Sequence, residues 1–227
     1  MIGDKYPRTF HLPFSPGATS DDKRMYPGWF EDLYIGNKEL VLTEKLDGEN
    51  IHMNQRGVFA RSDGAETRKP WSRNLWENDG LYWKVKQFLS PEETIYGENL
   101  FGIHSIIYDE LPEYFHLFAA KEGERWFSWE EVEEMAVILG VRTVPVLWKG
   151  KFASESLLQQ KILELMSKPS TYGKEKEGIV VRTADEFWTT EEGMNSFPFH
   201  VWKYVRPNHV QTDQHWTKNW KKAELIN

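Results

Sequence analysis

Short β-rich runs joined by tight turns fill residues 40–61, and they limit what the chain can fold into. Residues 40–45, 50–54 and 57–61 have strand-like compositions, and the dipeptides Asp47-Gly48 and Arg56-Gly57 between them favour turns. Strands this close along a chain are typical of antiparallel pairing. The spacing therefore predicts a three-stranded meander.

The rest of the chain mixes strands and helices without strict alternation. Ser128 and Glu131 are typical of a capping box at the start of a helix that Gly140 ends, and a second helix ends before Lys168-Pro169. A further helical stretch over residues 71–89 is broken near residues 78–80. This mixture predicts an α+β fold with antiparallel sheets and helices packed outside them. Strand-like composition recurs at residues 94–101, 114–120, 143–148, 178–182 and 199–205.

The length of 227 residues fits one domain, and the turn-rich residues 1–38 read as an ordered loop region with little regular structure. The chain has no cysteine, which excludes disulfides, thiolate zinc sites and cysteine nucleophiles. The remaining option for a metal is a hard cation on carboxylates. No run approaches the roughly 18 apolar residues of a membrane span. The first ten residues include the charged side chains Asp4, Lys5 and Arg8, where a signal peptide would be apolar. We therefore expect a cytoplasmic protein with no membrane partner.

The net charge of −7 is unevenly distributed. Nine acidic and two basic side chains lie between Asp109 and Glu134, so the other residues together are neutral. Residues 200–222 carry five basic side chains and one acidic one. Binding a polyanion needs a local basic surface and not a basic average, so the acidic total does not exclude a nucleic-acid partner.

Residues 43–50 are the stretch most suggestive of chemistry. Lys45 ends an apolar strand-like run, and Asp47 in the following turn brings a carboxylate, a ligand for a hard cation, close to that amine. An amine is a nucleophile only when deprotonated, and burial or neighbouring cations can lower a lysine's pKa by several units. The same pattern also fits a β-turn with a solvated lysine, so it does not decide the function by itself.

The order of several segments along the chain narrows the choice. Together they resemble the motifs of the lysine-dependent nucleotidyltransferases, the superfamily of ATP-dependent polynucleotide ligases and mRNA capping enzymes. The resemblance extends from about Val41 to Arg206 and rests on Lys45 to Asn50 (motif I), Arg61-Ser62 (Ia), Tyr96 to Glu98 (III), Phe115 to Phe118 (IIIa), Glu177 to Arg182 (IV) and Trp202 to Val205 (V).

The resemblance implies the fold of a ligase adenylation domain, in which two antiparallel β-sheets flanked by helices hold a nucleotide pocket between them. Asn50 at the end of motif I is similar to the phage-type RNA ligase 2 clade, whereas DNA ligases and capping enzymes usually have arginine there. The 21 residues after Arg206 are too few for an OB-fold domain. We therefore expect a single nucleotidyltransferase domain over residues 1–227, with residues 207–227 as a basic, aromatic tail.

The resemblance also implies roles for individual residues. Lys45 would attack the α-phosphorus of ATP, and Lys203 would neutralise the α-phosphate. Phe118 would stack on the adenine. The implied catalytic residues are Lys45, Asp47, Glu177 and Lys203, the implied nucleotide-binding residues are Glu44, Asn50, Arg61, Glu98, Phe118, Arg182 and Lys203, and the implied ligands of Mg²⁺, with Mn²⁺ as an alternative ion, are Asp47, Glu98 and Glu177.

The implied function is sealing of a 5′-phosphate to a 3′-hydroxyl end of RNA, through a lysyl-AMP intermediate and an adenylated 5′ end. Two alternatives remain open. One is a minimal ligase of DNA or of RNA/DNA hybrid ends, which is favoured by Asp47 because some RNA ligases of this clade have histidine there. The other is a non-catalytic nucleic-acid-binding subunit of a repair assembly. A kinase or phosphatase that prepares the ends would be a natural partner.

Two further regions are open to more than one interpretation. Motif V of the superfamily often carries two lysines separated by one residue, but only Lys203 is present here, with Arg206 as a nearby second cation. The tail interleaves aromatic and basic side chains, which is typical of a single-strand-binding surface or of an amphipathic packing helix.

Overall fold

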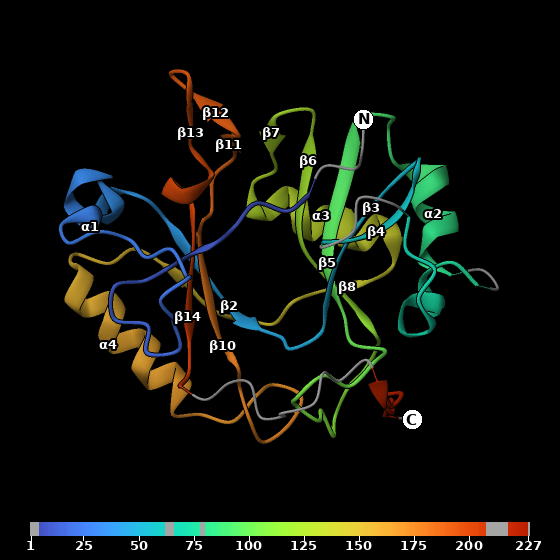
Figure 1. Ribbon diagram of the computed structural model, residues 1–227. Coiled ribbons are helices and arrows are strands. Elements are labelled where there is room, and N and C mark those ends of the chain that lie inside the picture. Colours follow the sequence, from blue (N-terminus) through green and yellow to red (C-terminus); the bar gives the residue numbers. More distant parts are fainter. Residues whose placement is uncertain (1–4, 62–65, 78–79, 208–217, 227) are drawn as a thin grey trace.

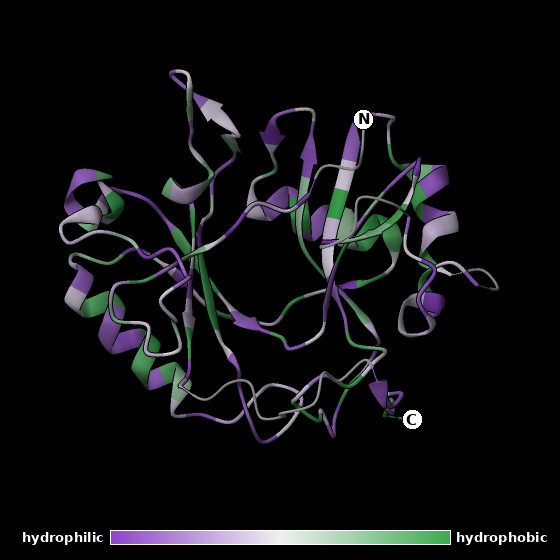
Figure 2. Ribbon diagram, in the orientation of Figure 1, coloured by the Kyte–Doolittle hydropathy of each residue, from purple (hydrophilic) through white to green (hydrophobic). Residues whose placement is uncertain are grey.

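Two β-sheets face one another and carry helices on their outer sides (Figure 1). The computed structural model describes residues 5–61, 66–77, 80–207 and 218–226. Hydrophobic residues are concentrated along the strands and on the inward sides of the helices (Figure 2). The expected α+β fold is therefore confirmed.

The first sheet has five strands in the order β1 (Phe10–His11), β14 (Val201–Val205), β10 (Gly178–Thr183), β2 (Leu40–Lys45) and β9 (Val146–Gly150). All neighbours are antiparallel except β1 and β14, which are parallel. Because side chains alternate across a strand, one face of this sheet is apolar and packs against α1 (Trp29–Asp32) and α4 (Glu155–Met166). The other face carries Thr43, Lys45 and Lys203 toward the second sheet.

The second sheet has the strand order β11 (Phe187–Trp188), β7 (Arg125–Trp126), β6 (Phe115–Glu122), β5 (Glu93–Asn99), β3 (Glu49–Asn54) and β4 (Gly57–Ala60), with β8 (Arg142–Thr143) parallel to β6. Its outer face packs against α2 (Leu81–Phe88) and α3 (Trp129–Leu139). The remaining elements are the hairpin β12 (Thr190–Glu191) and β13 (Met194–Asn195) and the 3₁₀ helices η1 (Ile35–Asn37), η2 (Pro70–Leu75) and η3 (Phe197–Phe199).

The capping box is confirmed. The Ser128 hydroxyl accepts from the Glu131 amide at 3.2 Å, and the Glu131 carboxylate accepts from the Ser128 amide at 2.8 Å. Gly140 ends α3 with a φ of 64°, a left-handed conformation that suits glycine. The second expected helix is α4, and it ends at Met166, before Lys168-Pro169.

The predicted meander is wrong at its first turn. β2 lies in the five-stranded sheet and β3 in the seven-stranded sheet, so Asp47-Gly48 connects the two sheets, and only β3 and β4 form a hairpin. A Cβ on Gly48 would lie 2.6 Å from the carbonyl oxygen of Asn99, so the connection passes against β5 at a distance that only glycine allows. Turn residues mark where a strand ends but not which sheet the next strand joins.

One other element differs from the prediction, and one agrees with it. The single strand expected over residues 143–148 is two strands, β8 and β9, because the chain changes sheets at Val144-Pro145. The helical stretch expected over residues 71–89 with a break near residues 78–80 is confirmed as two helices, η2 and α2, although η2 is a 3₁₀ helix.

The N-terminal region and the described part of the C-terminal tail both contact the rest of the fold. The N-terminal region holds β1, α1 and η1, consistent with an ordered loop of little regular structure. Of the tail, residues 208–217 lie outside the described residues. Residues 219–226 form no helix: Trp220 packs against Phe101 with ring centroids 5.9 Å apart, and the Ala223 amide donates to the Phe101 carbonyl. Within the described ranges, no helix is both long and apolar enough to cross a membrane.

Candidate active site

A pocket with a volume of about 270 Å³ lies between the inner faces of the two sheets. All of the expected site residues except Asp47 and Glu177 line it. The full lining is Tyr6, Thr9, Thr43, Glu44, Lys45, Leu46, Gly48, Asn50, Arg61, Glu98, Phe118, Trp129, Val144, Val180, Arg182, Val201 and Lys203.

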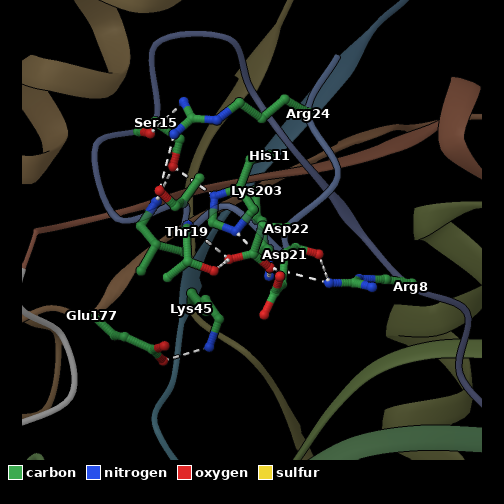
Figure 3. A network of polar contacts seen from close by, with 12 residues as sticks. Arg8, His11, Ser15, Thr19, Asp21, Asp22, Arg24, Lys45, Glu177 and Lys203 are labelled. Carbon is green, nitrogen blue, oxygen red and sulfur yellow. Dashed lines mark hydrogen bonds and ion pairs between the residues drawn. The ribbon is translucent and has the colours of Figure 1, made fainter.

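Lys45 occupies the end of β2, where the chain leaves one sheet for the other. Its ammonium group is 2.5 Å from the Glu177 carboxylate, which immediately precedes β10 (Figure 3). Burial by itself would lower the pKa of Lys45, but the carboxylates of Glu177, Glu98 and Asp47 together raise the pKa above its ordinary value. In this state Lys45 is a cation, so it must lose a proton before it can act as a nucleophile.

Glu98 and Asp47 are held by backbone groups around Lys45. The Glu98 carboxylate accepts from the Gly48 amide at 3.1 Å, and burial, together with Glu177 and Asp47, raises the pKa of Glu98 to about 8. One Asp47 oxygen accepts three hydrogen bonds, from the amide and hydroxyl of Ser105 at 2.8 and 2.6 Å and from the amide of Ile106 at 2.8 Å. Asp47 therefore borders the site from outside the pocket lining.

The acidic residues of the site fit a divalent cation that takes only some of its ligands from the protein. The described residues contain no group of three or more histidine and carboxylate side chains that could hold a metal by themselves. A Mg²⁺ ion, however, is commonly held by one or two carboxylates and otherwise by water and substrate phosphates. The carboxyl groups of Asp47, Glu98 and Glu177 all act on the Lys45 ammonium, and this cluster of oxygen ligands fits such an ion.

Lys203 and Arg61 bring positive charge to the same pocket. Lys203 lies in the middle of β14, and its ammonium is 3.9 Å from the Asp22 carboxylate. Burial, Lys45 and Arg61 lower the pKa of Lys203, whereas Asp22 and Glu177 oppose that shift. Arg61 follows β4, and its amide donates to the Asn50 carbonyl at 3.0 Å.

Aromatic side chains form one wall of the pocket. Phe118 contacts Tyr6 edge to face, with ring centroids 5.0 Å apart, and Tyr6 also packs against Tyr96 at 5.3 Å. The exposed face of such a ring is a surface on which a planar base can stack.

The polar side chains that line the pocket differ in whether they already form hydrogen bonds with other protein groups. The Glu44 carboxylate accepts from the amide and hydroxyl of Thr171, at 2.9 and 2.8 Å, and from the Ser170 hydroxyl. Arg182 donates to the Phe127 carbonyl at 2.7 Å, and burial lowers its pKa to about 10. In contrast, the buried side-chain oxygen of Asn50 has no hydrogen-bond partner among the described residues.

Arg206 does not line the pocket. Its guanidinium donates to Glu175 at 2.8 Å, and it borders a separate hollow at the end of α4 together with Lys168 and Lys174.

Sequence reasoning allowed Arg8, His11 and Pro16-Gly17 to line the groove, but it missed the N-terminal residues that contribute to the pocket. Tyr6 and Thr9 line the pocket, and Asp22 contacts Lys203, although none of them belongs to a motif. Trp129 and Val144 were also missed, and no local pattern distinguishes them from ordinary core residues.

A comparison with protein families decides the relationship. The model of the family described as RNA ligase matches residues 38–205, which is well over half of the chain. The chain belongs to the RNA ligase family. The family identified from the ordered motifs is confirmed, whereas the phage-type subclass remains a prediction.

Solved structures agree with an RNA ligase fold. An RNA ligase of Naegleria gruberi, solved as a mutant with ATP and Mn, has a TM-score of 0.57 and 16% identity, with 86% of this chain and 58% of that chain covered. A putative ATP-dependent DNA ligase from Aquifex aeolicus has a TM-score of 0.54 and 19% identity, with 89% and 50% covered. An archaeal ATP-dependent RNA ligase has a TM-score of 0.54 and 16% identity, with 89% and 48% covered.

The chain therefore spans about half to three fifths of the length of these ligases. At 16–19% identity, the similarity to these structures shows that this chain has the same fold as they do. The comparison with curated proteins gave no match.

Proposed function

We propose that the protein is an ATP-dependent RNA ligase that joins a 5′-phosphate to a 3′-hydroxyl end through a lysyl-AMP intermediate. The observation that carries the proposal is the position of Lys45. Its side chain lines the pocket between the two sheets together with Lys203 and Arg61, and the carboxyl groups of Glu177, Glu98 and Asp47 act on its amine. Membership of the RNA ligase family supports the same reading.

In the first step, the Lys45 nitrogen attacks the α-phosphorus of ATP. A nitrogen–phosphorus bond forms, the bond from the α-phosphorus to the bridging oxygen breaks, and pyrophosphate leaves. Lys45 gives up one proton before the attack and a second as the phosphoramidate forms. In the ligand-free protein the amine is paired with Glu177, and it would leave that carboxylate to react.

The other pocket residues orient the nucleotide. Phe118 would stack on the base, and the unpartnered oxygen of Asn50 is placed to accept a hydrogen bond from the ligand. Lys203 would compensate the charge that grows on the α-phosphate. Positioning and charge compensation of this kind supply most of the catalysis of phosphoryl-type transfer. Glu44, Arg61, Glu98 and Arg182 would complete the nucleotide contacts.

Asp47, Glu98 and Glu177 would hold Mg²⁺ or Mn²⁺. When bound, the ion would neutralise charge on phosphate oxygens. The Naegleria gruberi structures with ATP and Mn support a divalent ion in this role.

The later steps use the same site. A 5′-phosphate end takes the AMP from Lys45, and a 3′-hydroxyl then displaces AMP and seals the strand. A ligase of DNA or RNA/DNA hybrid ends is the second candidate, and the likeness to the putative DNA ligase of Aquifex aeolicus supports it. Nicked duplexes with ribose or deoxyribose on the 3′ side would separate the two candidates.

The deciding experiment is incubation with ATP and Mg²⁺ followed by intact-mass measurement. We expect the protein to gain one AMP, and we expect Lys45→Ala to gain none. Lys151→Ala, which removes an exposed lysine outside the pocket, should be labelled like the unaltered protein.

Two outcomes would count against this proposal. An unaltered protein that gains no AMP would instead indicate a non-catalytic nucleic-acid-binding subunit. Preferential labelling in a parallel reaction with GTP would indicate capping chemistry.

A further inference from the structure

The N-terminal loop brings a carboxylate to the edge of the pocket. β1 pairs with β14, and the Leu12 amide donates to the Lys203 carbonyl at 2.9 Å. The chain then turns back, so that the Met25 amide donates to the His11 carbonyl at 2.8 Å. This return path places Asp22 beside the Lys203 side chain (Figure 3).

The two oxygens of Asp22 have different tasks. Oδ2 accepts from the amide and hydroxyl of Thr19, at 3.1 and 3.0 Å, which fixes the carboxylate to its own loop. Oδ1 faces three cationic or titratable groups: Lys203 at 3.9 Å, His11 at 3.5 Å and Arg8 at 3.7 Å. Hydrogen bonds within the loop therefore hold Asp22 with Oδ1 turned toward Lys203.

The loop itself is tied to the five-stranded sheet. Arg24 donates to the carbonyls of Ser15 at 3.1 Å and Ala18 at 3.0 Å, and the Ser15 hydroxyl accepts from the Val205 amide at 3.0 Å. A Cβ on Gly17 would lie only 2.4 Å from the Arg206 carbonyl oxygen, so this approach requires glycine.

Lys203 needs such a counter-charge. It lines the same pocket as Lys45 and Arg61, and both of those cations act on it unfavourably. A lysine side chain is long and flexible, so like charges would turn its ammonium away from the position that a phosphate requires. Asp22 is the carboxylate in ion-pair contact with the Lys203 ammonium, and Asp22 does not line the pocket.

We propose that Asp22 is a positioning residue, which holds the Lys203 ammonium toward the α-phosphate without touching the nucleotide. The inference rests on the proposed function of Lys203 in adenylylation. It assigns a role in the reaction to the N-terminal loop, outside all of the sequence motifs.

The first test is Asp22→Asn. The amide keeps an oxygen for Thr19 but loses the charge that holds Lys203. We expect the rate of lysyl-AMP formation at saturating ATP to fall by about 10- to 100-fold, because small displacements of a positioning group cost this much. The KM for ATP should change little. Asp21→Asn, which removes the same charge from an exposed neighbour, should leave the rate unchanged.

A double-mutant cycle separates positioning from a general structural role. In a Lys203→Met background, Asp22→Asn should cause no further loss of rate, because the group it acts through is gone. A further 10-fold loss in that background, or equal rates for the Asp22 and Asp21 variants, would overturn the inference. Equal melting temperatures would show that the variants fold.

A readout independent of turnover keeps this inference distinct from the proposed function. In protein carrying ¹⁵N-labelled lysine, the Lys203 ammonium signal should shift and exchange faster in Asp22→Asn than in Asp21→Asn. If the unaltered protein forms no lysyl-AMP, the proposed function fails, and this signal decides the inference about Asp22: an unchanged signal overturns it.

Discussion

At the scale of single residues, the site brings together two lysines with opposite requirements. In the proposed reaction, Lys203 stays charged to meet a phosphate, whereas Lys45 loses a proton to attack one. In the ligand-free protein each lysine lies next to a carboxylate: Lys45 is 2.5 Å from Glu177 and Lys203 is 3.9 Å from Asp22. In the proposed reaction, Lys45 would leave Glu177 while Lys203 keeps its pairing with Asp22.

Asn50 provides a test in which binding and stability separate. Its side-chain oxygen is buried in the pocket without a partner among the described residues, and an unpaired buried oxygen costs about 1–3 kcal/mol. Asn50→Ala should therefore not lower the free energy of unfolding of the ligand-free protein, but it should weaken ATP binding about 10-fold. Calorimetric titration with ATP and chemical denaturation would measure the two effects. Loss of stability with unchanged ATP binding would contradict the assigned role.

The residues that could be predicted from the sequence are those in short ordered motifs. Lys45, Glu98 and Lys203 meet in one pocket although they lie far apart in the chain, as the motif order implied. Tyr6 and Asp22 could not be predicted, because their positions depend on how a loop without motifs folds back over β14.

At the scale of elements, the connection between β2 and β3 organises the site. Residues 46–48 carry the chain from one sheet to the other, with Lys45 on one side and Asn50 on the other. The individual strands follow from composition and alternation, and β2 has the predicted bounds. Their assignment to different sheets depends on partners more than 40 residues away, and no local pattern contains that information.

Gly48→Ala tests this connection. The new Cβ would lie 2.6 Å from the Asn99 carbonyl and 2.7 Å from a Leu100 methyl, so the backbone must shift. We expect a loss of about 1–3 kcal/mol in unfolding free energy and a large loss of lysyl-AMP formation.

Gly36→Ala is the matched control, because its Cβ would meet no atom closer than 3.4 Å. It should change neither quantity appreciably. If Gly48→Ala behaved like this control in both assays, the connection would not be needed in its present geometry.

At the scale of the whole molecule, charge is separated between surface and interior. None of the nine acidic side chains of residues 109–134 lines the pocket: four lie on α3, Glu122 ends β6, and the other four lie in the loop before β6 and the turn between β6 and β7. The pocket between the sheets receives its cations from β2, β10 and β14 and from Arg61 after β4. A net charge of −7 is therefore compatible with a site for a polyanion.

The packing between β11 and β14 makes the stability of the molecule sensitive to acid. His200 stacks on Phe187 with ring centroids 4.2 Å apart and lies 3.1 Å from the Thr183 hydroxyl. Burial, with Lys38 and Arg182 nearby, lowers the pKa of His200 to about 3, although the Glu191 carboxylate lies 3.6 Å away. Burial dominates because Glu191 is half-exposed and well solvated.

The sign of the effect follows from proton linkage. Below a pH of about 6.5 the unfolded chain binds a proton at this histidine and the folded protein does not, so stability is lost as the pH falls toward 3. The slope should reach at most about 1.4 kcal/mol per pH unit. Chemical denaturation of the unaltered protein and of His200→Gln between pH 7 and pH 4 would measure it, because the difference between the two isolates this group from the carboxylates. Parallel curves would show instead that His200 becomes charged in place, paired with Glu191.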